Sequence, residues 1–246
     1  MKFSTAKEHR DFFQKHGWIE FEGFIPADQL TLVNHAIDLV LAERSKVIPE
    51  RLKTLSSEKM FLEGRDLWRL SPFLQKYVAH SRFTEIASEL IEVKSLRLGY
   101  DQFFPSRQEK PFANETSQVY SHFLEQITPL QTVSCLKGIA CGFMISLGGK
   151  EVEKGEKIED PLENPVEGID VFPREAGHVI FFQPNLVINW NQLYSHLGQK
   201  YYMVVYTQIH ANYQLEPQDP HTHTLKRVGY VFNDKLDDRL NPIIYR

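Results

Sequence analysis

The order of the hydrophobic patterns along the chain restricts the fold more than any other feature of the sequence. Before residue 94 apolar residues recur mainly at helical spacing, and after it they form the runs and alternations of β-strands. Helical and strand patterns do not alternate, which disfavours folds built from βαβ units. The sequence therefore predicts an α+β fold with a barrel or sandwich. We expect a single domain, mainly helical over residues 1–94 and strand-rich over 95–246.

Short patterns near the N-terminus predict a helix followed by a strand. Thr5 and Glu8 have the spacing of a capping box, so a helix is expected from there to Gly17. Residues 18–24 alternate between apolar and polar positions, which indicates a short strand.

Two further helices are expected before residue 94. Pro26 and Asp28 open the first, whose apolar stripe is formed by Leu30, Val33, Ile37, Val40 and Leu41. Ser71 and Pro72 open the second, because proline is tolerated in the first turn of a helix. We expect a break in this second stretch near His80.

Apolar runs predict the strands of the second part. Three strands are expected at residues 95–104, 177–182 and 201–209. A fourth run, 133–147, contains Gly138 and Gly142, and glycine inside a strand pattern indicates a bulge or a barrel corner. A last short strand is expected at 227–232.

Residues 151–170 differ in composition from the rest of the chain. They include eight acidic residues and only two lysines, with little apolar content. The segment lacks the Asp-x-Asp-x-Asp-Gly spacing of a calcium loop. We therefore expect an acidic, exposed loop between two strands.

Charge and hydropathy exclude several classes of protein. The net charge of −4 disfavours a nucleic-acid-binding protein, which usually carries a basic surface. No apolar run is long enough to cross a membrane, and the first thirty residues do not resemble a signal peptide. Cys135 and Cys141 would lie about 20 Å apart on one strand, too far for a disulfide. We expect two buried thiols and a cytoplasmic location.

Two stretches of the sequence carry motifs that together indicate a known family. The first is Phe-Phe-Gln-Lys-His-Gly-Trp at 12–18, followed by a strand and by Ile-Pro-Ala-Asp-Gln-Leu at 25–30. The second is Pro-Arg-Glu-Ala-Gly-His-Val-Ile-Phe-Phe at 173–182. Together they resemble the phytanoyl-CoA dioxygenase family of non-haem Fe(II), 2-oxoglutarate-dependent oxygenases, and residues 95–104 and 201–207 are similar to two further core strands of that family. The resemblance implies a double-stranded β-helix (a jelly-roll, cupin-like core) with N-terminal helices packed on one side.

The resemblance also implies where iron ligands should stand, and those positions hold other residues. The family binds iron through a His-x-Asp motif and a second histidine, the facial triad of such enzymes. His122 is followed by Leu124 at the aspartate position, and the second histidine is replaced at about Ile188. The family's 2-oxoglutarate-binding arginine aligns with Lys200, which lacks the bidentate fork of arginine. We therefore predict neither Fe(II) nor 2-oxoglutarate as a cofactor.

Other histidines are weaker candidates for metal binding. His122 and Glu125 would share a face if their segment is helical, and His196 is near the missing second histidine in sequence. The pair His221 and His223 has the spacing of ligands on a strand, but its flanking prolines indicate an exposed loop. We expect no metal site at any of these positions.

The resulting hypothesis is a 2-oxoglutarate oxygenase-like protein with a degenerate metal site, used as a non-catalytic or repurposed small-molecule-binding domain. We expect Lys200, Trp190 and His178 to line its pocket, with a small carboxylate as the ligand of Lys200. One alternative is an active dioxygenase that uses Fe(II) and 2-oxoglutarate with atypical ligands. Another is a metal- or ligand-responsive regulatory or interaction protein that forms a homodimer through its helical layer.

Overall fold

The computed structural model describes residues 5–106, 119–149, 171–195 and 198–246 of the 246-residue chain. The acidic segment 151–170 and His196 lie outside these ranges, so the expectations for them remain predictions. Among the described residues, no helix has the length and apolar character needed to span a membrane.

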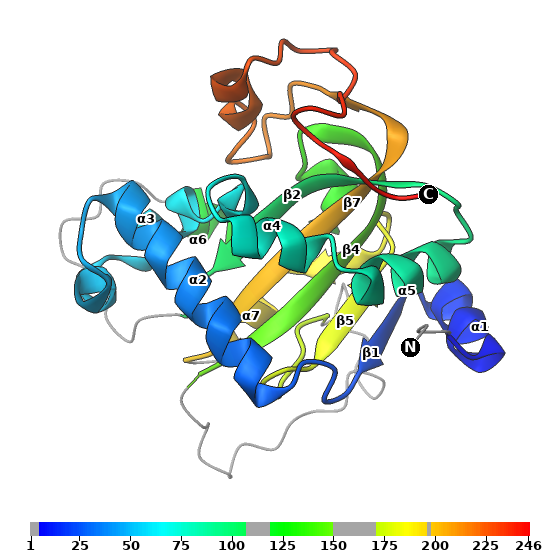
Figure 1. Ribbon diagram of the computed structural model, residues 1–246, viewed down its shortest axis with the longest axis horizontal. Coiled ribbons are helices and arrows are strands. Elements are labelled where there is room, and N and C mark those ends of the chain that lie inside the picture. The colour runs from blue at the N-terminus through cyan, green and yellow to red at the C-terminus, as the bar shows by residue number, and fades with distance from the viewer. Residues whose placement is uncertain (1–4, 107–118, 150–170, 196–197) are drawn as a thin grey trace.

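Two antiparallel sheets form the core. The larger has six strands in the order β1-β5-β4-β7-β2-β8, and the smaller pairs β3 with β6. The bounds are β1 Trp18–Phe21, β2 Leu96–Phe104, β3 Ile127–Pro129, β4 Leu136–Gly148, β5 Val179–Phe182, β6 Val187–Asn189, β7 Lys200–Tyr213 and β8 Ile243–Tyr245. The long strands β4 and β7 lie at the centre of the larger sheet, which curls into a half-barrel (Figure 1).

Most helices precede the barrel in sequence, and α2, α4 and α5 cover one face of the larger sheet (Figure 1). The α-helices are α1 Lys7–His16, α2 Ala27–Ser45, α3 Ser57–Glu63, α4 Pro72–Val78, α5 Ser81–Ile91, α6 Val119–Leu124 and α7 Gln192–Ser195. Short 3-10 helices are η1 Pro49–Thr54, η2 Leu67–Arg69, η3 Leu130–Thr132 and η4 Thr224–Val228. The fold is the α+β double-stranded β-helix, with helices on one side, that the sequence predicted.

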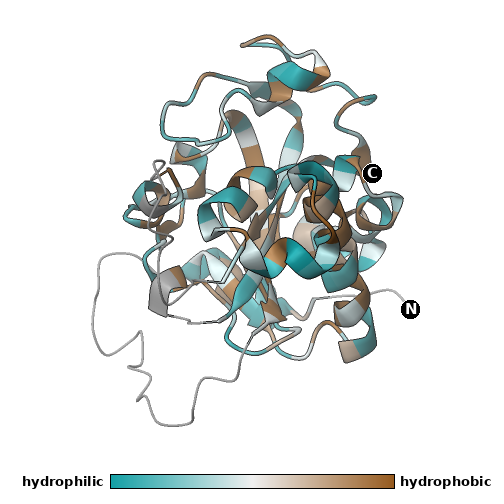
Figure 2. Cartoon of the chain, turned by 90° about the vertical axis from the view of Figure 1, so that its left-hand side faces the viewer, coloured by the Kyte–Doolittle hydropathy of each residue, from teal (hydrophilic) through white to brown (hydrophobic). Residues whose placement is uncertain are grey.

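Alternate residues of β7 enter two different hydrophobic cores, because successive side chains of a strand point to opposite faces. Tyr202, Val204 and Tyr206 pack with the helices in the first core. Their neighbours Tyr201, Met203 and Val205 pack inside the barrel, in the second core. Figure 2 shows hydrophobic residues on the strands and hydrophilic residues on the outer side of the helices. The sheet therefore separates a helix-covered face from the barrel interior.

The local helix and strand predictions are largely confirmed, with two corrections at short motifs. Thr5 does not cap α1, whose N-cap is Ala6; the Thr5 hydroxyl instead donates to Glu89 on α5 at 2.7 Å. Residues 227–232 are not a strand, because η4 occupies their start and Gly229 turns the chain with a φ of 105°. The expected bulge at Gly138 is present as a register shift between β4 and β7.

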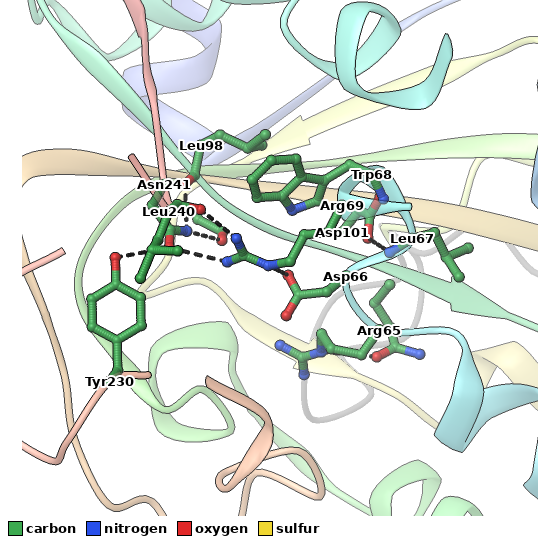
Figure 3. A network of polar contacts seen from close by, with 12 residues as sticks. Arg65, Asp66, Leu67, Trp68, Arg69, Leu98, Asp101, Tyr230, Leu240 and Asn241 are labelled. Carbon is green, nitrogen blue, oxygen red and sulfur yellow. Dashed lines mark hydrogen bonds and ion pairs between the residues drawn. The ribbon is translucent and has the colours of Figure 1, made fainter. Parts of the chain in front are cut away.

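The C-terminal segment 214–246 covers one end of the barrel, at the top of Figure 1. Asn241 fastens it: its side-chain N–H groups donate to the carbonyls of Leu98 (2.9 Å) and Gly99 (2.7 Å) on β2. Its side-chain oxygen accepts hydrogen bonds from Arg69 (3.0 Å) and Tyr230 (3.1 Å), as Figure 3 shows. We call this segment the C-terminal cap and the end that it covers the capped end.

Candidate functional site

The barrel interior is apolar at the positions where the resemblance places iron ligands. Leu124, at the aspartate position, is 1 % exposed, and Ile188, at the second histidine position, is fully buried. Both belong to the same hydrophobic cluster, which also holds Trp190. Both residues are therefore part of the apolar barrel interior, and neither side chain can donate an electron pair to a metal.

Aromatic rings surround Trp190 inside the barrel. Its ring centroid lies 4.9 Å from that of Phe123, 6.0 Å from that of Phe172 and 6.1 Å from that of Phe104. The indole N–H donates to the carbonyl of Thr128 at 3.2 Å, so its one polar atom is satisfied. Trp190 is fully buried and occupies this part of the interior as a core residue.

Lys200 lies on the other face of the sheet from the Trp190 cluster. Its ammonium group donates to the side-chain oxygen of Asn34 on α2 at 3.1 Å. Burial raises the pKa of Asp38 on the same helix. The positive charge of Lys200 is close enough to act against this rise. Lys200 therefore already has an amide and a carboxylate as neighbours on the helix-covered face.

His178 occupies a third place, at the start of β5. Its Nδ1 lies 3.0 Å from Glu20 Oε1 on β1, and its Nε2 lies 3.4 Å from Glu175 Oε2. The two carboxylates flank opposite nitrogens of the imidazole, which fixes the ring between them. The structure does not bring Lys200, Trp190 and His178 together around one cavity.

The candidate ligand pair of His122 and Glu125 is on the surface. The side chains of His122 and Glu125 on and beside α6 are 78 % and 70 % exposed, with 3.8 Å between His122 Nδ1 and Glu125 Oε2. Apart from His196, which is not described, His221 alone among the histidines is buried. No group of three or more His, Cys, Asp or Glu side chains in the described ranges could hold a metal ion. The described residues do not fit the iron triad.

A buried polar cluster near the capped end is the feature that the sequence did not reveal. Arg65, which follows α3, donates from Nη2 to Asp219 Oδ1 of the cap at 3.2 Å and from Nε to Gln102 Oε1 at 3.0 Å. Its guanidinium carbon lies 3.7 Å from the centroid of the Tyr100 ring. The partners of Arg65 are far apart in sequence, so no local pattern marks them.

His221 belongs to this cluster, which corrects its expected exposure. It is 6 % exposed and packs its ring 5.2 Å from that of Phe61, whereas His223 is exposed. Burial, and the positive charges of Arg65, Arg44 and Arg227, lower its pKa well below the usual range. A neutral imidazole is therefore expected at pH 7. Burial also raises the pKa of the nearby Cys135 thiol, which keeps it protonated.

Comparison with solved structures finds the same fold in non-haem iron enzymes. SnoK, a non-haem α-ketoglutarate-dependent carbocyclase from nogalamycin biosynthesis, matches with a TM-score of 0.62 and 17 % identity over 97 % of this chain and 96 % of SnoK. The α-ketoglutarate-dependent epimerase SnoN matches with a TM-score of 0.60 and 15 % identity over 98 % of both chains. This chain has the fold of the α-ketoglutarate (2-oxoglutarate) oxygenases. No protein-family model and no curated protein sequence matches it.

Proposed function

We propose that this chain uses the 2-oxoglutarate oxygenase fold as a non-catalytic domain whose metal site has been replaced by hydrophobic core. The observation that carries this proposal is the burial of Leu124 and Ile188 with Trp190 in one apolar cluster. A ferrous ion with its 2-oxoglutarate needs several charged or polar ligands, and an apolar surrounding destabilises an unpaired charge. The chain then acts by binding a ligand or a partner, and not by turnover.

Iron binding tests this proposal directly. The metal-stripped protein is titrated with Fe(II) under anaerobic conditions by calorimetry, with and without 2-oxoglutarate. We expect weak Fe(II) binding that 2-oxoglutarate leaves unchanged. Binding of one Fe(II) per chain that 2-oxoglutarate tightens would overturn the proposal and identify an oxygenase with atypical ligands.

The competing oxygenase hypothesis relies on His122, Glu125 and His196. It requires oxygen-dependent turnover of 2-oxoglutarate that His122→Ala abolishes and that His9→Ala, which replaces an exposed histidine on α1, leaves intact. The exposure of His122 and Glu125 to solvent argues against a preformed site at this pair. No turnover in the wild-type protein supports the non-catalytic proposal.

The nature of the bound molecule is the second part of the proposal. Within the described residues, the ammonium group of Lys200 donates a hydrogen bond to Asn34, and a small carboxylate is a suitable further ligand for an ammonium group. The neighbouring Asp38 carboxyl competes for the same charge. We place the chain in the cytoplasm, because both cysteines are free and buried. The homodimer alternative is tested by sedimentation over a hundredfold range of concentration.

A further inference from the structure

A small chamber lies between the barrel wall and the C-terminal cap. The residues that line it include Gly99 and Tyr100 of β2, Cys135 and Leu136 at the start of β4, and His221 and Leu225 of the cap. The cavity volume is about 10 Å³, close to the minimum needed for one water molecule. The chamber is therefore too small for a metabolite, but large enough for a single solvent molecule.

Three of the side chains that line this chamber carry a buried polar atom without a hydrogen-bond partner among the described residues. These atoms are Nε2 of His221, the hydroxyl of Tyr100 and Oδ1 of Asp66. Ser134 lies beside Tyr100 and lowers the pKa that burial raises, without reaching hydrogen-bond geometry. Leaving a buried polar atom without a hydrogen bond is unfavourable, so several of them at one cavity require an explanation.

The arginine and the aspartate that line the chamber are each in an ion pair. Arg65 is bound to Asp219, whose Oδ1 also accepts the backbone N–H of His221 (2.8 Å) and whose Oδ2 accepts that of Cys135 (2.7 Å). Asp66, which also lines the cavity, has Arg69 at 3.5 Å. Arg65, the one arginine among the lining residues, is therefore compensated by Asp219. A neutral molecule that both donates and accepts hydrogen bonds suits the unpartnered atoms, one of which belongs to a carboxylate.

We propose that this chamber is the binding site of one permanent water molecule, which bridges the Tyr100 hydroxyl of the barrel and His221 Nε2 of the cap. The neutral imidazole can accept from the water or donate to it, and the tyrosine hydroxyl can do the same. The water then completes the polar cluster and joins the cap to the wall at a point where no direct contact is made. This inference is independent of the proposed function.

A crystal structure at a resolution that shows ordered solvent tests the bridge. We expect one density peak within hydrogen-bond distance of both Tyr100 Oη and His221 Nε2. The Tyr100→Phe variant keeps the ring against Arg65 but removes the hydroxyl, and it should lose this peak. The matched control is Tyr206→Phe, because the Tyr206 hydroxyl is equally buried but already donates to the Val78 carbonyl at 2.5 Å; this variant should keep the peak.

Solution measurements give a second readout of the same water. Oxygen-17 relaxation dispersion counts long-lived internal waters, and the count should fall by one in Tyr100→Phe and stay constant in Tyr206→Phe. An empty chamber in the wild-type crystal, or a peak retained at full strength in Tyr100→Phe, would overturn the bridge. So would a bromide anomalous signal in soaked crystals, since it would show an anion in the chamber.

Discussion

The hydroxyl of Tyr202 on β7 donates a short hydrogen bond to the carboxylate of Asp101 on β2, on the helix-covered face of the sheet. The same carboxylate accepts the backbone N–H groups of Leu67 (2.6 Å) and Trp68 (2.9 Å), at the start of η2. Asp101 is fully buried, so it joins two strands and the helical layer through one side chain. The stability of the helical layer on the barrel should depend on this group.

Replacing Asp101 with asparagine tests that dependence. The amide N–H₂ group would face the Trp68 N–H and the Tyr202 hydroxyl, whose hydrogen bonds Oδ2 now accepts. A buried donor would then be left without a partner. We expect a loss of about 1–3 kcal/mol in the free energy of unfolding, measured by urea denaturation. Asp11→Asn, at an exposed position on α1, should change it by less than about 0.5 kcal/mol.

The effect of Asp101→Asn should also depend on pH. Burial raises the pKa of the Asp101 carboxyl to about 7, against the hydrogen bond from Tyr202, which lowers it. The unfolded carboxyl ionises near pH 4, so the folded state binds the extra proton between about pH 4 and 7. This group's contribution to stability therefore falls as pH rises through that range. The loss in free energy of unfolding caused by Asp101→Asn should be largest near pH 4 and smaller above pH 7. A loss that does not change with pH would contradict the raised pKa of Asp101.

Tyr202→Phe removes the hydroxyl and keeps the ring. A hydrogen bond to a charged acceptor contributes about 1.5–3 kcal/mol, and we expect a loss in that range at pH 8, where the carboxyl is ionised. In a double-mutant cycle with Asp101→Asn the two losses should not add, because both variants remove the same bond. Additive losses would show that the two side chains act independently.

The helices and strands were predictable where the pattern that forms them is local. The stripe from Leu30 to Leu41 predicted α2, and the run from Tyr201 to Ile209 predicted most of β7. That Leu124 and Ile188 stand where the resemblance places iron ligands was visible in the sequence, because a resemblance assigns ligands position by position. Their convergence in one cluster needed the structure, since α6 and β6 are far apart in sequence.

The polar clusters were not predictable, because their members meet only after folding. Arg65 and Asp219 are separated by 154 positions, and Thr5 and Glu89 by 84. Lys200 was expected with Trp190 at the mouth of the barrel, lining one pocket, but the face on which a strand residue lies depends on register. Bulges in the β4–β7 pairing change that register in ways that hydrophobicity does not reveal.

The Arg65–Asp219 pair should be far more important for stability than a surface ion pair. Arg65→Met leaves Asp219 as an uncompensated buried charge, for which a loss of about 3–5 kcal/mol is expected. Lys59→Met breaks the exposed Lys59–Glu63 pair on α3 and should cost less than about 1 kcal/mol. Thermal and urea unfolding measure the loss of free energy of unfolding in each variant. Equal losses in Arg65→Met and Lys59→Met would contradict the greater importance of the buried pair.

Lys200→Ala separates a binding role from a structural one. Lys200 is only partly buried, and its hydrogen bond to Asn34 is a single contact at the end of the sheet. The free energy of unfolding of Lys200→Ala should therefore differ from the wild-type value by less than about 1 kcal/mol. A fluorescence or calorimetric screen of small carboxylates should then show weaker binding to Lys200→Ala and unchanged binding to Lys76→Ala, an exposed lysine on α4. Equal binding to both variants would remove Lys200 from the ligand site.

Trp190→Ala distinguishes a filled barrel from an occupied pocket. Trp190 is a core residue, so its truncation to alanine should lower the free energy of unfolding by about 3–5 kcal/mol. The surrounding rings cannot close the space left behind. That space has the shape and polarity of an indole, so added indole should raise the melting temperature of Trp190→Ala and leave the wild-type value unchanged. If the variant instead loses less than about 1 kcal/mol and gains affinity for 2-oxoglutarate, Trp190 is a removable plug. The barrel would then retain a ligand site beneath it, and the proposal of a metal site replaced by core would fail.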